Sequence, residues 1–212
     1  MVINDIGYEA MRIHYHLPNS RSLVRTWREG WQTIRDGKRL DISDDLSSFR
    51  QSVNAINKGD HSPIQGIEVG KSGLMIRGLT SVEDEQGKHL GSTEVMFSFD
   101  VILDAISNDY SSNYAVFMDS QLLSVATSLK DSKKFPIIDN QFVLTNSTNK
   151  DLLVHFIGGD FLSSSRDQIQ HIKKDNFFLS GMPIRDYSGK PIGAFVLAQD
   201  MTQQYTLRSK AH

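Results

Sequence analysis

The sequence predicts an α+β protein made of two lobes, each an antiparallel sheet flanked by helices. The first reason is a strand–turn–strand pattern that occurs twice. Its copies carry glycines at matching places: Gly78, Gly87, Gly91 and Gly181, Gly189, Gly193. The offsets of 181 − 78 = 103, 189 − 87 = 102 and 193 − 91 = 102 residues indicate an internal repeat. The second reason is that hairpins and short helices alternate without helical crossovers between parallel strands. We place the lobes at residues 1–106 and 107–205, with a tail over 206–212.

The first lobe opens with a strictly alternating segment. From Met11 to Leu17, apolar residues occupy the odd positions, whereas Arg12, His14 and His16 share the other side. This period of two predicts a strand with one polar face. Ser22 to Trp27 follows a Pro-Asn-Ser turn and is predicted to be its hairpin partner. Leu23, Arg25 and Trp27 are expected to share a face of that second strand.

A helix is predicted from Ser43 to about Gly59. Ser43 is a suitable N-cap, and two acids follow it in the first turn. The apolar residues of this segment recur at helical spacing: Leu46, Phe49, Val53 and Ile56. The rest of the lobe is expected to form strands over 64–69, 74–82 and 93–99, followed by a short helix over 101–106.

The second lobe gives weaker patterns. Residues 114–118 and 122–126 are expected to form a hairpin around the turn at 119–121, and 130–134 reads as a polar connection. Further expected elements are short strands at 142–144 and 152–156, a helix over 161–172 that carries His171, and the repeated hairpin at 177–184 and 192–199.

Composition and motifs exclude several classes of function. With 39% hydrophobic and 23% charged residues the chain is ordinary globular material, and a net charge of −2 without a basic stripe makes nucleic acid an unexpected partner. The absence of cysteine excludes disulfides, thiolate metal sites and Cys nucleophiles. No stretch reaches the about 18 apolar residues of a membrane span, and the N-terminus does not read as a signal peptide. No nucleotide-binding, zinc-protease or serine-hydrolase motif and no catalytic triad is present, so we expect no enzyme and no cofactor.

Several segments of the first lobe resemble the first sensory lobe of the double Cache family. They are His14–Pro18, Arg21–Trp27, Asp44–Arg50, Gly66–Gly70, Ile76–Gly78 and Gly91–Glu94. In the second lobe, Phe178–Asp200 is similar to the closing strand pair of that family. Double Cache domains supply extracytoplasmic sensor regions to bacterial chemoreceptors, sensor kinases and diguanylate cyclases.

The resemblance implies two tandem PAS-like lobes and a periplasmic ligand-sensing domain of a transmembrane receptor, most of all a methyl-accepting chemotaxis protein. A histidine kinase or a diguanylate cyclase is the alternative output, and an ectodomain that binds no small ligand is the alternative function. The resemblance further implies a homodimer in the full-length receptor and membrane segments outside this chain. We expect a small anionic or zwitterionic ligand in the first lobe.

Two histidines are the first candidate site residues. His14 and His16 lie two apart on one strand face, so both rings can reach one metal ion, with Glu68 or Glu94 as a third ligand. The same rings can instead contact an anionic ligand, change charge near neutral pH, or bond backbone groups where the strand packs against the helix. We expect ligand contact or structure, and no metal.

Arginines and an aromatic side chain complete the expected site. Arg25 and Arg77 can hold an anion through their planar guanidinium groups, with Trp27 as an aromatic wall and Glu68 as a further contact. The alternative is an internal ion pair, Arg77 with Glu68 or Arg25 with Glu94. Asp44, Asp45 and Arg50 are assigned to helix capping and surface, and the two Gly-Lys turns to structure. The expected ligand-binding residues are therefore His14, His16, Arg25, Trp27, Glu68 and Arg77.

Overall fold

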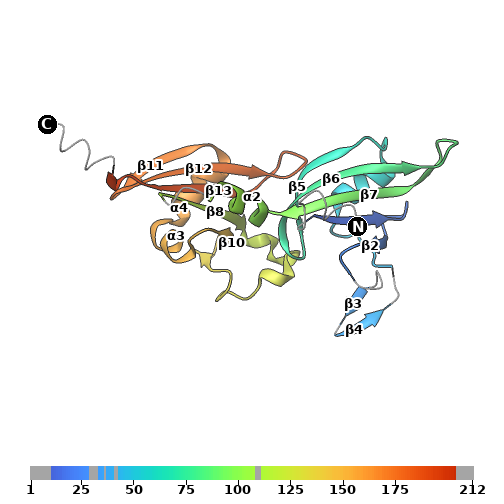
Figure 1. Cartoon of the computed structure of the whole chain (residues 1–212), viewed down its shortest axis with the longest axis horizontal. Helices are drawn as coiled ribbons and strands as arrows, with labels where there is room; N and C mark the ends of the chain where they lie inside the picture. The colour runs from blue at the N-terminus through green and yellow to red at the C-terminus, as the bar shows by residue number, and fades with distance from the viewer. Residues whose placement is uncertain (1–10, 29–32, 36, 41–42, 108–110, 204–212) are drawn as a thin grey trace. The chain divides into compact units, whose positions relative to one another are not determined.

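The protein divides into two compact units, each built around an antiparallel sheet of its own (Figure 1). The computed structural model describes residues 11–28, 33–35, 37–40, 43–107 and 111–203. The first unit comprises Met1–Gly70 with Met75–Ser98, and the second Lys71–Leu74 with Phe99–His212. The lobe boundaries expected from the sequence stay a prediction, and the tail over 206–212 lies outside the described residues. No helix among the residues described is long and apolar enough to cross a membrane.

The sheet of the first unit has the strand order β2-β1-β7-β6-β5. Its strands are β1 (Arg12–His16), β2 (Ser22–Arg25), β5 (Ile64–Gly70), β6 (Gly73–Glu83) and β7 (His89–Ser98). Helix α1 (Gln51–Lys58) packs against β5 and β7. Four buried apolar side chains join this helix segment to the sheet: Leu46, Val53, Ile56 and Leu79. The helical spacing in the sequence therefore identified the correct packing face.

The helix predicted from Ser43 begins only at Gln51. The residues before it are bound to the β2 region instead. The Ser43 hydroxyl donates to the carbonyl of Ser22, and the backbones of Asp45 and Arg21 pair in an isolated antiparallel β-bridge. These contacts hold residues 43–45 against the β2 region, and residues 47–49 form a turn before the helix, whose N-cap is Arg50. The predicted N-cap role of Ser43 is therefore wrong. The expected end of the helix near Gly59 is confirmed, since Gly59 follows its last residue.

Two further features of the first unit were not expected from the sequence. Between β2 and α1 lies a separate hairpin, formed by β3 (Thr33–Arg35) and β4 (Lys38–Leu40). In β2, a bulge opposite Tyr15 and His16 shifts the alternation. Leu23 is therefore exposed while Arg25 is buried, and the two do not share a face.

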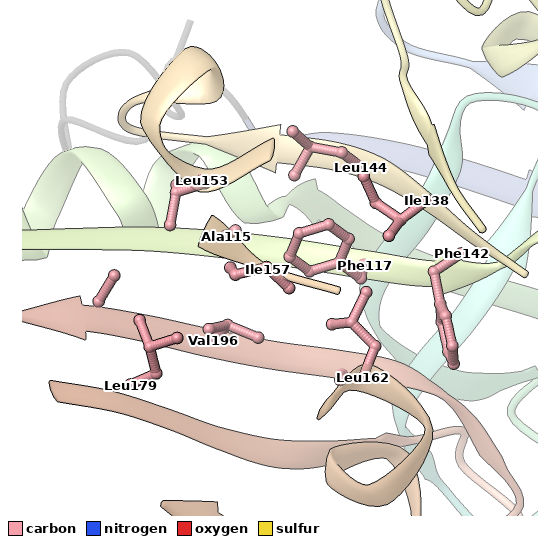
Figure 2. Close-up of a cluster of buried hydrophobic side chains, with 12 residues drawn as sticks. Ala115, Phe117, Ile138, Phe142, Leu144, Leu153, Ile157, Leu162, Leu179 and Val196 are labelled. Carbon is pink, nitrogen blue, oxygen red and sulfur yellow. The ribbon is translucent and has the colours of Figure 1, made fainter. Parts of the chain in front are cut away.

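The sheet of the second unit has the order β11-β12-β13-β8-β10-β9. Its elements are α2 (Phe99–Ile106), β8 (Ser112–Asp119), the 3-10 helices η3 (Ser120–Ser124) and η4 (Thr127–Leu129), β9 (Ile137–Ile138), β10 (Phe142–Ser147), α3 (Lys150–Phe156), α4 (Gly159–Asp167), β11 (Gln170–Lys174), β12 (Phe177–Arg185) and β13 (Pro191–Asp200). Figure 2 shows the apolar cluster that fills this unit, where Phe117 on β8 lies among side chains from the sheet, α3 and α4, including Leu153 and Leu162.

Three elements of the second unit differ from the prediction. Residues 120–124 form a 3-10 helix rather than the turn and return strand of a hairpin. Residues 150–156 are helical because the side chain of Asn149 accepts a hydrogen bond from the Leu152 N–H and caps the helix, which short apolar runs do not reveal. The helix predicted over 161–172 ends at Asp167, and His171 lies on β11, which pairs with β12.

The repeated hairpin is confirmed and has the same local cause in both units. In each turn an aspartate, Asp84 or Asp186, accepts hydrogen bonds from the backbone of the residues two and four positions later. Gly91 and Gly193 then allow a neighbouring strand to come close. A Cβ atom on Gly91 would lie 2.1 Å from the His16 carbonyl oxygen, and one on Gly193 would lie 2.0 Å from that of Phe117.

Candidate functional site

A cluster of buried charged and polar side chains lies between α1 and the sheet of the first unit. His14 and His16 on β1 stand opposite Glu94 and Ser92 on β7 in the strand register. The polar face of β1 is the buried one, whereas Tyr15 on the other face is 41% exposed. This inverts the usual distribution of polar and apolar residues on a strand, so the polar groups must find their partners inside the protein.

Glu94 is the centre of the cluster and is completely buried. Its Oε2 accepts from Arg50 Nη2 at 2.6 Å and from Arg77 Nη1 at 3.0 Å. Its Oε1 accepts from Arg50 Nη1 at 3.1 Å. Burial alone would raise the pKa of Glu94, but the two arginines and the hydrogen bonds with both histidines hold that pKa well below its usual range. The side chain is therefore an anion.

Glu68 joins the same cluster to the start of α1. It accepts from the Ser52 backbone N–H at 2.8 Å, from Ser52 Oγ at 2.6 Å and from Arg50 Nε at 2.8 Å. A carboxylate at this position accepts from a backbone N–H of the first turn that has no partner within the helix. Its negative charge also interacts favourably with the positive end of the helix dipole. Arg77 Nε lies 3.8 Å from Glu68 Oε2. Two guanidinium groups thus face two carboxylates, and the formal charge of this group of four is zero.

The two histidine rings point their inner nitrogens at each other and at Glu94. His14 Nδ1 and His16 Nε2 lie 3.0 Å apart, and they lie 3.1 and 3.3 Å from Glu94 Oε1. Burial lowers the pKa of His14 to about 3 and also lowers the pKa of His16, in spite of the nearby carboxylate. Both rings are consequently neutral near pH 7.

The outer nitrogens of these rings bond to hydroxyl groups. His14 Nε2 lies 2.8 Å from Ser22 Oγ, and His16 Nδ1 lies 3.0 Å from Ser92 Oγ. Asn57 of α1 donates to Ser92 Oγ at 3.0 Å. Each ring is therefore fixed at both ends by side chains of the first unit.

Arg25 and Trp27 lie beside this cluster. Arg25, opposite His14 in the register, donates to Asp44 Oδ2 at 2.8 Å and so forms a buried ion pair with Asp44, a partner that was not expected from the sequence. The half-buried Trp27 ring stands edge-on to His14 with 5.6 Å between ring centroids. Arg77 pairs with Glu94, as well as lying near Glu68. That the six predicted residues bind a ligand stays a prediction, but the structure brings all six to one region.

Sequence reasoning missed several members of the cluster. Arg50 and Asp44, assigned to surface and capping, are buried and form the ion pairs described above. Ser22, Ser52, Ser92 and Asn57 were not singled out. One signal was available: Leu46, Arg50, Val53 and Asn57 follow the 4-3-4 spacing of a buried helical stripe, which places Arg50 and Asn57 among core positions.

Two hollows of ligand size lie elsewhere. One of about 500 Å³ borders β5, β6 and β7 and includes Gly78, Thr93 and Val95. The other, of about 460 Å³, lies in the second unit beside α2 and includes Asp100 and Asp104. None of the six predicted site residues lines either hollow.

Comparisons with known proteins bear on the whole chain. A family model described as a double sensory domain of two-component sensor kinase matches residues 2–205. No match is found among curated proteins.

Among solved structures, an extracellular ligand binding receptor from Desulfohalobium retbaense DSM5692 is 11% identical, with a TM-score of 0.52 over 93% of this chain. This chain spans 32% of that receptor. The V. cholerae histidine kinase DctB sensor domain is 12% identical, with a TM-score of 0.47 over 94% of this chain and 74% of that one. The ligand-binding domain of Campylobacter jejuni chemoreceptor Tlp3, solved with L-norvaline, is 10% identical, with a TM-score of 0.45 over 93% of this chain and 67% of that one. At such identities, likeness concerns the fold alone.

Proposed function

This chain belongs to the double Cache family of sensory domains, and on that premise we propose that it is the periplasmic sensor region of a two-component sensor kinase whose first unit binds a small zwitterionic molecule. The family makes the chain a signal-transduction module rather than a catalytic domain. The family description names sensor kinases, which favours a kinase output over the chemotaxis receptor predicted from the sequence. The homodimer of the full-length receptor stays part of the proposal.

The observation that supports the ligand class is the charge balance of the buried cluster. Arg50 and Arg77 are bound to Glu94, and Arg50 is also bound to Glu68. A ligand that enters between α1 and the sheet must replace some of these partners, because a buried charge without a partner is costly. A zwitterion supplies a carboxylate to the arginines and an ammonium group to the glutamates, so every charge keeps a partner. A simple anion would leave a glutamate unpaired.

The same contacts suggest how binding reaches the rest of the receptor. Glu68 and Glu94 hold the start of α1 through Ser52 and Arg50. A ligand that takes over these bonds changes the position of α1 on the sheet. It shifts the equilibrium between two arrangements by no more than its difference in affinity for them.

Thermal unfolding of the purified domain in a chelating buffer tests this proposal. We expect at least one zwitterionic amino acid to raise the Tm saturably, and simple dicarboxylates to have no effect. Arg77→Lys should abolish the response, because lysine keeps the charge but loses the two-pronged geometry. The matched control Arg166→Lys, in the exposed pair with Asp119 of the second unit, should keep it.

Three results would overturn the proposal: no zwitterion stabilises the domain, only dicarboxylates do, or Arg77→Lys responds like the wild type. If circular dichroism shows that Arg77→Lys does not fold, the thermal response of Ser52→Ala, which removes the hydroxyl bound to Glu68, is compared with those of the wild type and Arg166→Lys instead. Absence of any response would favour the ectodomain without a small ligand, for which the complete internal pairing of Glu94 is already suited.

A further inference from the structure

Three atoms with lone pairs converge in the buried cluster. They are His14 Nδ1, His16 Nε2 and Glu94 Oε1, separated from each other by 3.0, 3.1 and 3.3 Å. All three side chains are buried, and Glu94 is completely so. Such a meeting of acceptors inside a protein needs hydrogens or a cation between them.

The available protons do not satisfy both ring nitrogens. A neutral imidazole carries one N–H, and hydrogens on both inner nitrogens would face each other across 3.0 Å. At most one proton therefore lies among the three atoms while the rings are neutral. Glu94 Oε1 already accepts from Arg50 Nη1 at 3.1 Å. Wherever the ring proton sits, one ring nitrogen is left without a donor and turns its lone pair toward this anionic oxygen, at 3.1 or 3.3 Å.

We propose that His14, His16 and Glu94 bind a divalent first-row transition metal ion, with Zn²⁺ as the best match. A metal with bonds of about 2.0–2.2 Å holds neighbouring ligands about 2.8–3.1 Å apart at right angles and about 3.3–3.6 Å apart at the tetrahedral angle. The three distances of 3.0, 3.1 and 3.3 Å fall within this span. Two imidazoles and one carboxylate suit Zn²⁺, Ni²⁺ or Fe²⁺ rather than the all-oxygen preference of Ca²⁺ and Mg²⁺. The ion takes all three lone pairs at once and removes the conflict.

The partners of the outer nitrogens fit the same arrangement. With both inner nitrogens on the metal, His14 Nε2–H donates to Ser22 Oγ and His16 Nδ1–H donates to Ser92 Oγ. Metal-bound histidines are typically fixed by such a second hydrogen bond, which orients the ring. Glu94 Oε2 remains with Arg50 and Arg77, and Oε1 shares its lone pairs between the ion and Arg50 Nη1. These two guanidinium groups lie close to the ion and weaken its binding, so the site is expected to be reversible.

Metal binding goes beyond the proposed ligand and does not depend on it. The test uses Co²⁺ alone, whose visible absorption reports the ligand set, and Zn²⁺ alone by calorimetry, both on the full chain. We expect one ion per chain. His16→Ala should lower the affinity at least about 100-fold, and Ser92→Ala about 10- to 100-fold. His171→Ala and His61→Ala are controls on exposed or half-buried histidines outside the triad and should bind like the wild type.

Absence of binding, or unchanged binding by His16→Ala, would overturn the proposal. Loss of binding in His61→Ala would also overturn it, because that result would assign the ion to the stacked His61–His89 pair. If His16→Ala fails to fold, Ser22→Ala provides the comparison through the other ring. The amino-acid screen is done in chelator, so failure of the metal site leaves that screen unaffected, and failure of the screen leaves the metal titration unaffected.

Discussion

At the scale of single residues, Glu94 explains why the first unit buries so much polar chemistry. One carboxylate accepts from two arginines and lies against two histidines, so polar groups on β1 and β6 and at the start of α1 depend on it. Buried ion pairs of this kind contribute little relative to apolar residues, but breaking them is costly. This favours a role in recognition rather than in stability alone.

Glu94→Gln tests that dependence. The amide leaves two buried guanidinium groups short of a charge, so we expect a loss of about 3–5 kcal/mol in the free energy of unfolding. Urea denaturation followed by circular dichroism measures it. The control Asp119→Asn removes the partly exposed pair with Arg166 and should cost about 1 kcal/mol or less. A loss below 1 kcal/mol for Glu94→Gln would show that the cluster is held by other contacts.

At the scale of elements, the sequence revealed what local patterns encode and missed what distant contacts impose. The alternation of β1, the repeated hairpins and the apolar stripe of α1 were readable because each repeats over a few residues. The true start of α1 was not, because Ser43 and Asp44 bind the β2 region some twenty residues earlier. The burial of Arg50 was missed for the same reason, since its partners lie on β5 and β7.

The cap of α3 gives a prediction at this scale. Asn149→Ala removes the acceptor of the Leu152 N–H and should destabilise the protein by about 1 kcal/mol. The control Lys150→Ala changes the next exposed residue without removing the capping hydrogen bond. It should change the free energy of unfolding by less than about 0.5 kcal/mol. Equal effects of the two substitutions in chemical denaturation would contradict the assigned cap.

The close approach at Gly193 gives a second one. Gly193→Ala places a Cβ 2.0 Å from the Phe117 carbonyl oxygen, so β13 and β8 must separate, at a cost of about 1–3 kcal/mol or more. The control Gly78→Ala, in the first copy of the hairpin, would meet only the Val95 side chain at 3.6 Å, an ordinary contact, and should lower the free energy of unfolding by no more than about 0.5 kcal/mol. Wild-type stability of Gly193→Ala would refute this explanation of the repeated glycine.

At the scale of the whole molecule, the repeat has produced two units with the same turn chemistry but different interiors. The second unit is filled by apolar side chains (Figure 2), whereas the described residues of the first include six buried charged side chains and two buried histidines. Charged groups arranged in this way are able to exchange partners with a ligand, which an apolar core cannot do. This difference supports the proposal that the first unit is the sensing one.

Hydrogen exchange at the backbone amides of α1 tests this central claim most directly. It should be compared with and without the zwitterion that gives the largest thermal shift, in chelator. We predict that protection changes in Gln51–Lys58 and in the strands beneath it, β5 and β7, because the ligand replaces the bonds that hold the helix. A ligand-dependent change confined to residues 111–203, with α1 unaffected, would contradict the account.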